Sequence, residues 1–304
     1  MNKFYKILFA FITLTTLFSC SKDNPNPTVA LRDYTEQYAK DLDSINKFID
    51  THYMTVDTEY NVTFTKIADG GTQPSIRLQT DYPLQFKMVN NETHGVDYKI
   101  YYLKLREGDN ERPSAVDSVH VSYRGVETIK GTQFDFAQNP VWFKLEDLVV
   151  GWSEIMPYFK TGTYDATPGP NPVQFENYGA GVMFLPSGVG YYNTSAGVLP
   201  AYSTLVFSFK LYELNYRDHD GDGILSKDEI PFDAAPFYDP IDYDSDGDDV
   251  PNYFDVDDDD DRVLTKNEIK DTSGNTIPFL LIPDCSGNTT SANRVKKHLD
   301  PACH

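Results

Sequence analysis

The sequence has little cysteine or tryptophan and lacks the motifs of several common enzyme sites. Only 3 cysteines and 2 tryptophans occur among its 304 residues. It contains no Gly-x-Ser-x-Gly elbow and no glycine-rich phosphate loop, which argues against α/β-hydrolase and nucleotide chemistry. Its 6 histidines are scattered, and none pairs with another at the spacing of a zinc site. These absences favour functions that need neither a nucleophile motif nor a zinc ion.

Basic residues are also few, and the acidic excess is concentrated in one segment. The chain has 26 Lys and Arg against 46 Asp and Glu, a formal net charge of −20. Residues 218–271 hold 20 acidic and 4 basic residues, so they carry −16 and the rest of the chain only −4. Such a segment repels phosphates, and we expect no nucleic acid partner. An aromatic content of 14% favours a β-rich folded body over disorder.

The N-terminus has the pattern of an export signal. Lys3 and Lys6 precede an apolar stretch over residues 7–18, which is too short to span a bilayer as a stable helix. The pattern predicts a signal peptide over residues 1–19, followed by a polar tether over residues 20–33.

The end of this signal resembles a bacterial lipobox, because it reads Leu17-Phe18-Ser19-Cys20. The resemblance implies that Cys20 carries a lipid anchor that ties the protein to a membrane. Ser21 follows it, and by similarity to other Gram-negative lipoproteins this favours the outer membrane, on its periplasmic or its external face. The alternative is an ordinary secretory signal with an incidental cysteine.

The other two cysteines, Cys285 and Cys303, lie in the C-terminal extension, residues 272–304. An exported chain meets an oxidising compartment, so we expect a disulfide between them. The alternative is two unpaired thiols.

Periodicity predicts the secondary structure between these ends. Apolar residues recur at three- and four-residue steps over residues 34–48, which predicts a helix, and residues 53–90 alternate as short strands do. Strands are also expected over residues 98–105, 119–123 and 205–211. We therefore expect an N-terminal helix-and-strand segment over residues 34–95, a β domain over 96–215 and a calcium-binding segment over 216–271.

Three stretches of the β domain share the order and spacing of one known family. They are residues 119–125 with 131–135, residues 143–152 and residues 197–207. Together they resemble the proline pocket of FKBP-type peptidyl-prolyl cis/trans isomerases. The resemblance implies an α+β fold in which an antiparallel sheet wraps on a short helix, and a site for proline-containing polypeptides.

The chemistry of that family is rotation about an X–Pro bond. Its barrier is about 18–20 kcal/mol, and uncatalysed exchange takes on the order of tens of seconds or longer. An apolar socket that binds the twisted amide about 4 kcal/mol more tightly than the planar one raises the rate of isomerisation about a thousandfold. No cofactor is needed for this catalysis.

By position in the family pattern, ten residues line the site. They are Tyr123, Phe134, Asp135, Phe143, Val149, Trp152, Tyr191, Val198, Leu199 and Phe207. The resemblance makes Trp152 the floor under the proline ring, with Phe143, Val149 and Phe207 as walls. Asp135 and the hydroxyls of Tyr123 and Tyr191 would hold peptide carbonyls. The amide of Val149 would donate to the substrate.

The sequence departs from the family pattern at three places. Pro157 falls inside the expected short helix, where it would cause a kink. The loop over residues 163–180 is long and could cover the pocket. Residues 188–192 place two tyrosines side by side, so Tyr192 could displace Tyr191.

An internal repeat occupies the acidic segment, where residues 218–230 recur 39 residues later as residues 257–269. The first copy resembles an EF-hand calcium loop, because oxygen-bearing groups stand at positions 1, 3, 5, 7, 9 and 12 and Gly223 stands at 6. In the second copy Arg262 replaces that glycine, so its turn is expected to be strained.

Between the copies, residues 242–249 resemble the Asp-rich calcium repeats of extracellular modules. Asp255 would serve either this site or the second loop. The calcium ligands expected in the whole segment are Asp218, Asp220, Asp222, Ile224, Ser226, Glu229, Asp242, Asp244, Asp246, Asp248, Asp255, Asp257, Asp259, Asp261, Val263, Thr265 and Glu268. Calcium would be structural, because without it the crowded carboxylates repel one another.

The sequence as a whole predicts a lipid-anchored envelope protein that isomerises prolyl bonds in exported polypeptides and carries a calcium-ordered module. The alternative is a non-catalytic protein in which the same pocket holds a peptide segment of a partner and calcium stiffens the scaffold.

Overall fold

A computed structural model describes residues 31–165, 173–230, 243–291 and 293–303. The expected signal peptide, Cys20, most of the tether, Asp242 and residues 166–172 of the long loop lie outside this set. Among the described residues, none of the helices combines the length and the apolar character that crossing a bilayer requires.

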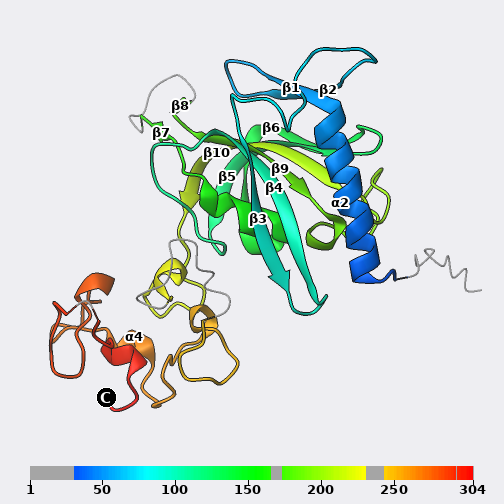
Figure 1. The fold of residues 1–304 in the computed structure, drawn as a ribbon. Coiled ribbons are helices and arrows are strands. Elements are labelled where there is room, and N and C mark those ends of the chain that lie inside the picture. Colours follow the sequence, from blue (N-terminus) through cyan, green and yellow to red (C-terminus); the bar gives the residue numbers. More distant parts are fainter. Residues whose placement is uncertain (1–30, 166–172, 231–242, 292, 304) are drawn as a thin grey trace, which may run out of the picture. The chain divides into compact units, whose positions relative to one another are not determined.

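Residues 84–215 contain a six-stranded sheet with the strand order β3-β4-β9-β10-β5-β6 (Figure 1). Every neighbouring pair in it is antiparallel. The strands are β3 (Leu84–Asn91), β4 (Val96–Arg106), β5 (Ser118–Glu127), β6 (Gln133–Lys144), β9 (Gly179–Leu185) and β10 (Leu205–Asn215). Helices and an antiparallel sheet together give the expected α+β class.

Side chains alternate across this sheet, as expected for extended strands. Phe207 and Phe209 of β10 belong to one apolar cluster, whereas Val206 between them belongs to another on the opposite face. We name the two faces after the helices that cover them, the α3 face and the α2 face.

The α3 face is covered by the short helix α3 (Val150–Ile155) and the 3-10 turn Met156–Tyr158. Trp152 and Ile155 of the helix pack in the same cluster as Phe207 and Phe209. The helix ends before Pro157, which lies in the first turn of the 3-10 segment, where no intrahelical N–H bond is needed. This corrects the expected kink, because the proline follows the helix instead of interrupting it.

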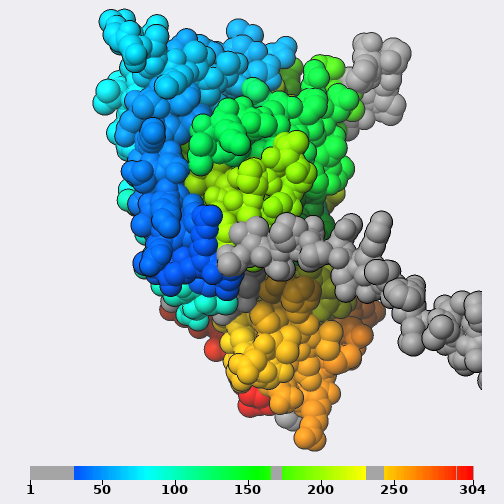
Figure 2. Space-filling model, turned by 90° about the vertical axis from the view of Figure 1, so that its right-hand side faces the viewer, coloured from blue at the N-terminus to red at the C-terminus, as the bar shows by residue number. Residues whose placement is uncertain are grey.

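The α2 face is covered by α2 (Tyr34–Thr51) and by the hairpin of β1 (His52–Val56) and β2 (Val62–Lys66). The helix begins after Asp33, whose side chain accepts a hydrogen bond from the Glu36 amide at 2.9 Å. Its residues Ile45, Phe48 and Ile49 are buried against the sheet. In Figure 2 the blue residues of α2 lie directly against the yellow-green residues before β10, and Tyr34 stacks on Tyr192 there.

The expected boundary between residues 95 and 96 needs correction. It falls in the turn of the β3–β4 hairpin, in which Val89 pairs with Tyr98 and Leu84 with Leu103. The N-terminal helix and strands are therefore part of the same sheet-centred body as residues 96–215.

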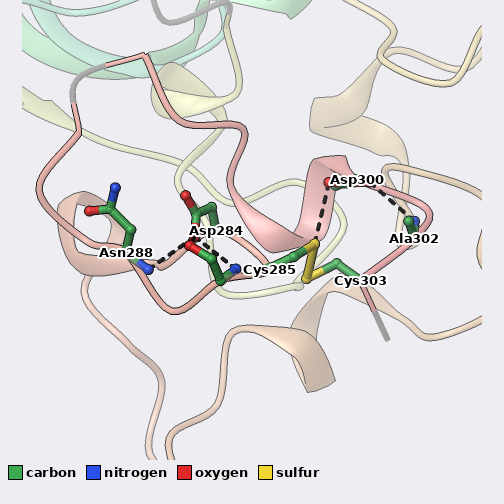
Figure 3. Close-up of a disulfide and its surroundings, with 7 residues drawn as sticks. Asp284, Cys285, Asn288, Asp300, Ala302 and Cys303 are labelled. Carbon is green, nitrogen blue, oxygen red and sulfur yellow. Dashed lines mark hydrogen bonds between the residues drawn. A yellow bond between two sulfur atoms is a disulfide. The ribbon is translucent and has the colours of Figure 1, made fainter.

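The acidic segment and the C-terminal extension have little regular structure beyond α4 (Thr265–Glu268) and short 3-10 turns. Their apolar core is small and centres on Ile224, Ile269 and Ile282. Cys285 and Cys303 form a disulfide with their Cα atoms 5.3 Å apart (Figure 3). Because so small a core contributes little apolar burial to stability, cross-links such as this disulfide are expected to stabilise the segment.

Candidate functional site

Aromatic side chains from distant parts of the chain meet around Trp152 on the α3 face. The centroid of the Trp152 ring lies 5.6 Å from that of Tyr123 and 5.3 Å from that of Phe207. Phe134 of β6 packs edge-on to Phe207 at 5.5 Å. These spacings are typical of edge-to-face aromatic packing.

The remaining expected apolar residues border this cluster. Phe143 lies 5.8 Å from Tyr123, and Tyr191 lies 6.4 Å from Phe134, measured between ring centroids. Val149 and Leu199 pack against the same cluster. Val198 differs, because it is 67% exposed and lines a cavity of about 70 Å³ beside Phe134 and Leu199.

The polar residues expected at the rim are also brought together. The Tyr123 hydroxyl donates a hydrogen bond to Asp135 Oδ2 at 2.8 Å. Burial raises the pKa of Tyr123, and the hydrogen bond to Asp135 raises it further. Burial, with the nearby Asp135 charge, also raises the pKa of Tyr191. Both phenols therefore stay protonated at neutral pH and can donate hydrogen bonds to carbonyl oxygens.

The two neighbouring tyrosines, Tyr191 and Tyr192, point to different places. Tyr192 has a positive φ of 44°, and its hydroxyl donates to the Arg32 carbonyl at 2.6 Å. It therefore stabilises the start of α2 and does not displace Tyr191 from the cluster.

Val149 stands immediately before α3. Its carbonyl accepts a hydrogen bond from the Trp152 amide at 2.9 Å. Its own amide has no acceptor in the described part of the chain. An unpaired N–H at this point is suited to a carbonyl of a bound peptide.

The floor of the expected socket is covered in this structure. Trp152 is only 3% exposed, and Phe207 is equally buried. Tyr123, whose ring contacts the indole, is only half-buried. A proline ring can reach the indole only if side chains that cover it move aside.

The described parts of the long loop pack elsewhere. Its strands β7 (Thr163–Tyr164) and β8 (Phe175–Glu176) pair with each other, and Phe175 packs on Tyr212 of the α2 face at 5.2 Å. These parts do not cover Trp152.

A larger cavity, of about 490 Å³, was not anticipated from the sequence. It lies on the α2 face between residues 59–63 of the β1–β2 hairpin and polar side chains of β5 and β10, among them Ser122, Arg124 and Ser208. The sequence predicted strands at these positions but gave no sign that the hairpin would border a cavity beside them.

The acidic segment contains three loops of the same backbone geometry, residues 218–224, 244–250 and 257–263. In each, the first Asp accepts a hydrogen bond from the amide five residues later. The donors are Gly223 at 3.1 Å, Asp249 at 2.9 Å and Arg262 at 3.1 Å. The middle stretch is thus a third copy of the loop, although its sequence showed only an Asp-rich pattern.

The sixth position of every loop has a positive φ. It is 103° at Gly223, 74° at Asp249 and 76° at Arg262. A non-glycine residue there costs roughly 1–2 kcal/mol. The strain expected at Arg262 is therefore present, and Asp249 shares it.

Carboxylate oxygens converge within each loop. Groups whose ligand atoms lie within 4.8 Å of one another are Asp218 with Asp220 and Asp222, Asp244 with Asp246 and Asp248, and Asp257 with Asp259 and Asp261. Several of the buried oxygens have no hydrogen-bond partner among the described residues, including both of Glu229 and both of Glu268. Hard oxygen donors arranged in this way suit Ca²⁺.

The pKa values of two of these carboxyl groups reflect their burial and their mutual repulsion. Burial and the neighbouring Asp222, Asp220 and Asp258 charges raise the pKa of Glu229 to about 10. Burial, with Asp259 and Asp261, raises the pKa of Glu268 to about 8. Without a cation, these groups cannot all be charged together at neutral pH.

The other expected ligands are placed as follows. Asp255 Oδ1 accepts a hydrogen bond from the Asp257 amide at 2.9 Å. The Ser226 and Thr265 hydroxyls accept backbone N–H groups from His219 and Asp258, at 3.3 and 3.1 Å. Ile224 and Val263, expected to act through their carbonyls, donate their amides to Asp222 and Asp261. The two hydroxyls thus first serve to close their own loops.

One acidic residue in this arrangement was missed by sequence reasoning. Asp258 lies with Asp222 and Glu229 in a fourth carboxylate group, which joins the first loop to the second. The second position of such a loop is not a ligand position, so the sequence pattern gave no reason to select it.

Comparisons with known proteins find similarities to parts of the chain. Two curated relatives are FKBP-type peptidyl-prolyl cis-trans isomerases named FkpA. One, from Aeromonas hydrophila, is 29% identical over 137 residues, which cover 44% of this chain and 43% of that protein. The other, a probable FkpA from Neisseria meningitidis serogroup B, is 29% identical over 130 residues, 41% of this chain and 40% of that protein. The chain thus matches less than half the length of these relatives.

Solved structures and a family model give the remaining similarities. A peptidyl-prolyl cis-trans isomerase from Pseudomonas syringae pv. tomato aligns with a TM-score of 0.36 at 18% identity, over 62% of this chain and 99% of that one. FkpA from Escherichia coli aligns with a TM-score of 0.35 at 20% identity, over 60% of this chain and 61% of that one. A family model described as BamM C-terminal matches residues 219–292. That description names no calcium loop.

Proposed function

We propose that this protein catalyses prolyl cis/trans isomerisation in exported polypeptides at the bacterial envelope. The observation that carries the proposal is the convergence of Trp152, Phe207 and the Tyr123–Asp135 pair at one place on the α3 face. The similarity to curated FKBP-type isomerases supports it independently.

The proposed mechanism uses binding alone. The aromatic cluster accepts the proline ring and excludes water. The dry site then binds the twisted amide more tightly than the planar one. Asp135 orients the Tyr123 hydroxyl in the free site, and on binding this hydroxyl turns from Asp135 to a substrate carbonyl. The free Val149 amide holds a second carbonyl, so the chain on either side of the prolyl bond is fixed while that bond rotates.

Replacing Asp135 with Asn tests the polar rim. We expect D135N to lower kcat/KM for a proline-containing peptide about tenfold, because the carboxylate that orients the Tyr123 hydroxyl loses its charge. The measurement is the protease-coupled rate of cis-to-trans conversion.

The matched control for D135N is Asp147→Asn, which removes an exposed carboxylate outside the aromatic cluster. We expect D147N to keep the activity of the unmodified protein. Equal activity of D135N and D147N would show that Asp135 has no role in turnover.

We further propose that the acidic segment binds calcium as a structural ion. The support is the set of converging, buried carboxylate oxygens without partners. When bound, calcium would supply only positive charge and coordination. Asp218, Asp220, Asp222 and Glu229 would hold it in the first loop, and their second-loop counterparts would hold another.

The lipid anchor is a proposal that the lipobox-like sequence before Cys20 supports. We expect cells that express the full chain to incorporate labelled fatty acid into it and to retain it in the membrane fraction. The Cys20→Ser variant should lose both the label and the membrane association. A labelled C20S protein would refute the anchor.

A second candidate function is peptide binding without turnover. The observation that favours it is the covered floor, because Trp152 and Phe207 are each only 3% exposed. If the cluster does not open, a peptide can bind only at the rim formed by Tyr123 and Asp135. Binding and turnover therefore have to be measured separately.

A further inference from the structure

Asp258 is deeply buried in the acidic segment, although it does not stand at a ligand position of any of the three loops. It stands at the second position of the loop that begins at Asp257, and it is only 1% exposed. Neither of its carboxylate oxygens has a hydrogen-bond partner in the described part of the chain. A buried carboxylate in this state is strongly unfavourable unless a positive charge compensates it.

Its side chain is directed toward the first loop and not toward its own. One oxygen of Asp258 lies within 4.8 Å of an oxygen of Asp222 and of one of Glu229, and both of these residues are also buried. Asp222 Oδ2 and both Glu229 oxygens likewise have no partner among the described residues. Three buried carboxylates that face one another in this way define a site for a cation.

The backbone of Asp258 is fixed by both neighbouring loops. Its amide donates to the Thr265 hydroxyl oxygen at 3.1 Å, and its carbonyl accepts a hydrogen bond from the Ser245 hydroxyl. The Thr265 amide in turn donates to the Val256 carbonyl at 3.0 Å. The second and middle loops thus hold the residue whose side chain reaches the first loop.

We propose that Asp258 is a ligand, contributed from outside the first loop, of the divalent cation bound by Asp222 and Glu229. This inference rests on the proposed calcium binding and deepens it. The ion then ties residues 218–229 to residues 257–268. Filling of the first loop and folding of the second become one linked equilibrium, so that each favours the other.

The test is Asp258→Asn in the full chain, with Asp260→Asn as its matched control. Asp260 belongs to the same loop but is exposed. It has a positive φ of 52°, which asparagine accepts. The two variants therefore make the same charge change two residues apart. Calcium chloride titration followed by calorimetry should show a loss of affinity of about tenfold or more in D258N and less than about twofold in D260N.

A stability measurement separates ligation from a merely structural role. D258N should lower the stability of residues 218–269 in calcium, because the ion loses one of its ligands. In chelator, where this segment is expected to unfold, D258N and the unmodified chain should be equally stable. A stability loss that is the same in calcium and in chelator would show that Asp258 supports the fold and not the ion, and that result would overturn the proposal.

Double variants identify the ion that Asp258 serves. The effects of D258N and Asp222→Asn on calcium affinity should be strongly non-additive, because both residues bind the same ion. D258N and Asp259→Asn, which are linked only through the second loop, should couple less strongly. Stronger coupling to Asp259 than to Asp222 would place Asp258 in its own loop and overturn the bridge. If the unmodified chain takes up no calcium, the proposed calcium function itself fails. Normal uptake by both the unmodified chain and D258N refutes the bridge alone.

Discussion

Removal of calcium with a chelator is expected to unfold residues 218–269 and to leave the six-stranded sheet folded. Two unit charges 4 Å apart repel by about 4 kcal/mol at the effective dielectric constant of a protein surface. The segment contains several such pairs, and the apolar cluster around Ile224, Ile269 and Ile282 is too small to offset them. The sheet has extensive apolar clusters on both faces and holds none of these carboxylates.

Hydrogen exchange in calcium and in chelator, at matched ionic strength because salt screens the repulsion, measures this effect. The Gly223 and Arg262 amides, which donate to the first Asp of their loops, should lose protection. The amides of β10 serve as the internal control and should be unchanged. Equal protection of the loops in both solutions would contradict a structural role for calcium.

Replacing Trp152 with Ala is expected to abolish isomerisation and to destabilise the fold. The indole is buried among Tyr123, Phe207 and Phe209, and deletion of a buried tryptophan side chain costs about 3–5 kcal/mol. In the proposed mechanism the proline ring also loses the surface that would hold it. The measurements are the rate of peptide isomerisation, at a temperature where circular dichroism shows the variant folded, and the urea midpoint.

The second tryptophan of the chain provides the matched control for W152A. Trp142 is 43% exposed and stacks on His120, away from the cluster around Trp152. Trp142→Ala should cost about 1 kcal/mol and keep the activity. If folded W152A isomerises the peptide as fast as W142A does, the aromatic cluster is not the active site.

Local pattern was sufficient to predict the main elements of the fold. The apolar spacing over residues 34–48 corresponds to α2, and the alternation over residues 205–211 corresponds to β10. Because the helix buries one stripe and the strand one face, the spacing of their apolar residues reveals the type of each element. The hairpin partner of β4 was harder to identify, because pairing across residue 95 depends on contacts between strands and not on either strand alone.

The sequence was sufficient to predict which residues meet at the candidate active site, but not how deeply they are buried. The sequence identified the aromatic residues that meet at Trp152, because each stands at a recognisable step of the family pattern. It could not show that neighbouring rings would cover Trp152 so fully, because burial depends on how side chains from β5, β6 and β10 pack together.

The acidic segment shows the same limit. Residues 257–261 are five successive aspartates, and nothing in the run distinguishes Asp258 from Asp260. Only the fold buries one and exposes the other. Tertiary position, and not residue type, therefore decides which of these carboxylates can serve a cation.

The most direct test of the isomerase proposal is NMR exchange spectroscopy on a proline peptide with a catalytic amount of the full chain in calcium. The account predicts cross peaks between the cis and trans forms whose build-up rate rises in proportion to protein concentration, and which W152A does not produce. Peptide signals that shift or broaden on binding, with no exchange between the two forms at any protein concentration, would contradict catalysis and leave a peptide-binding protein.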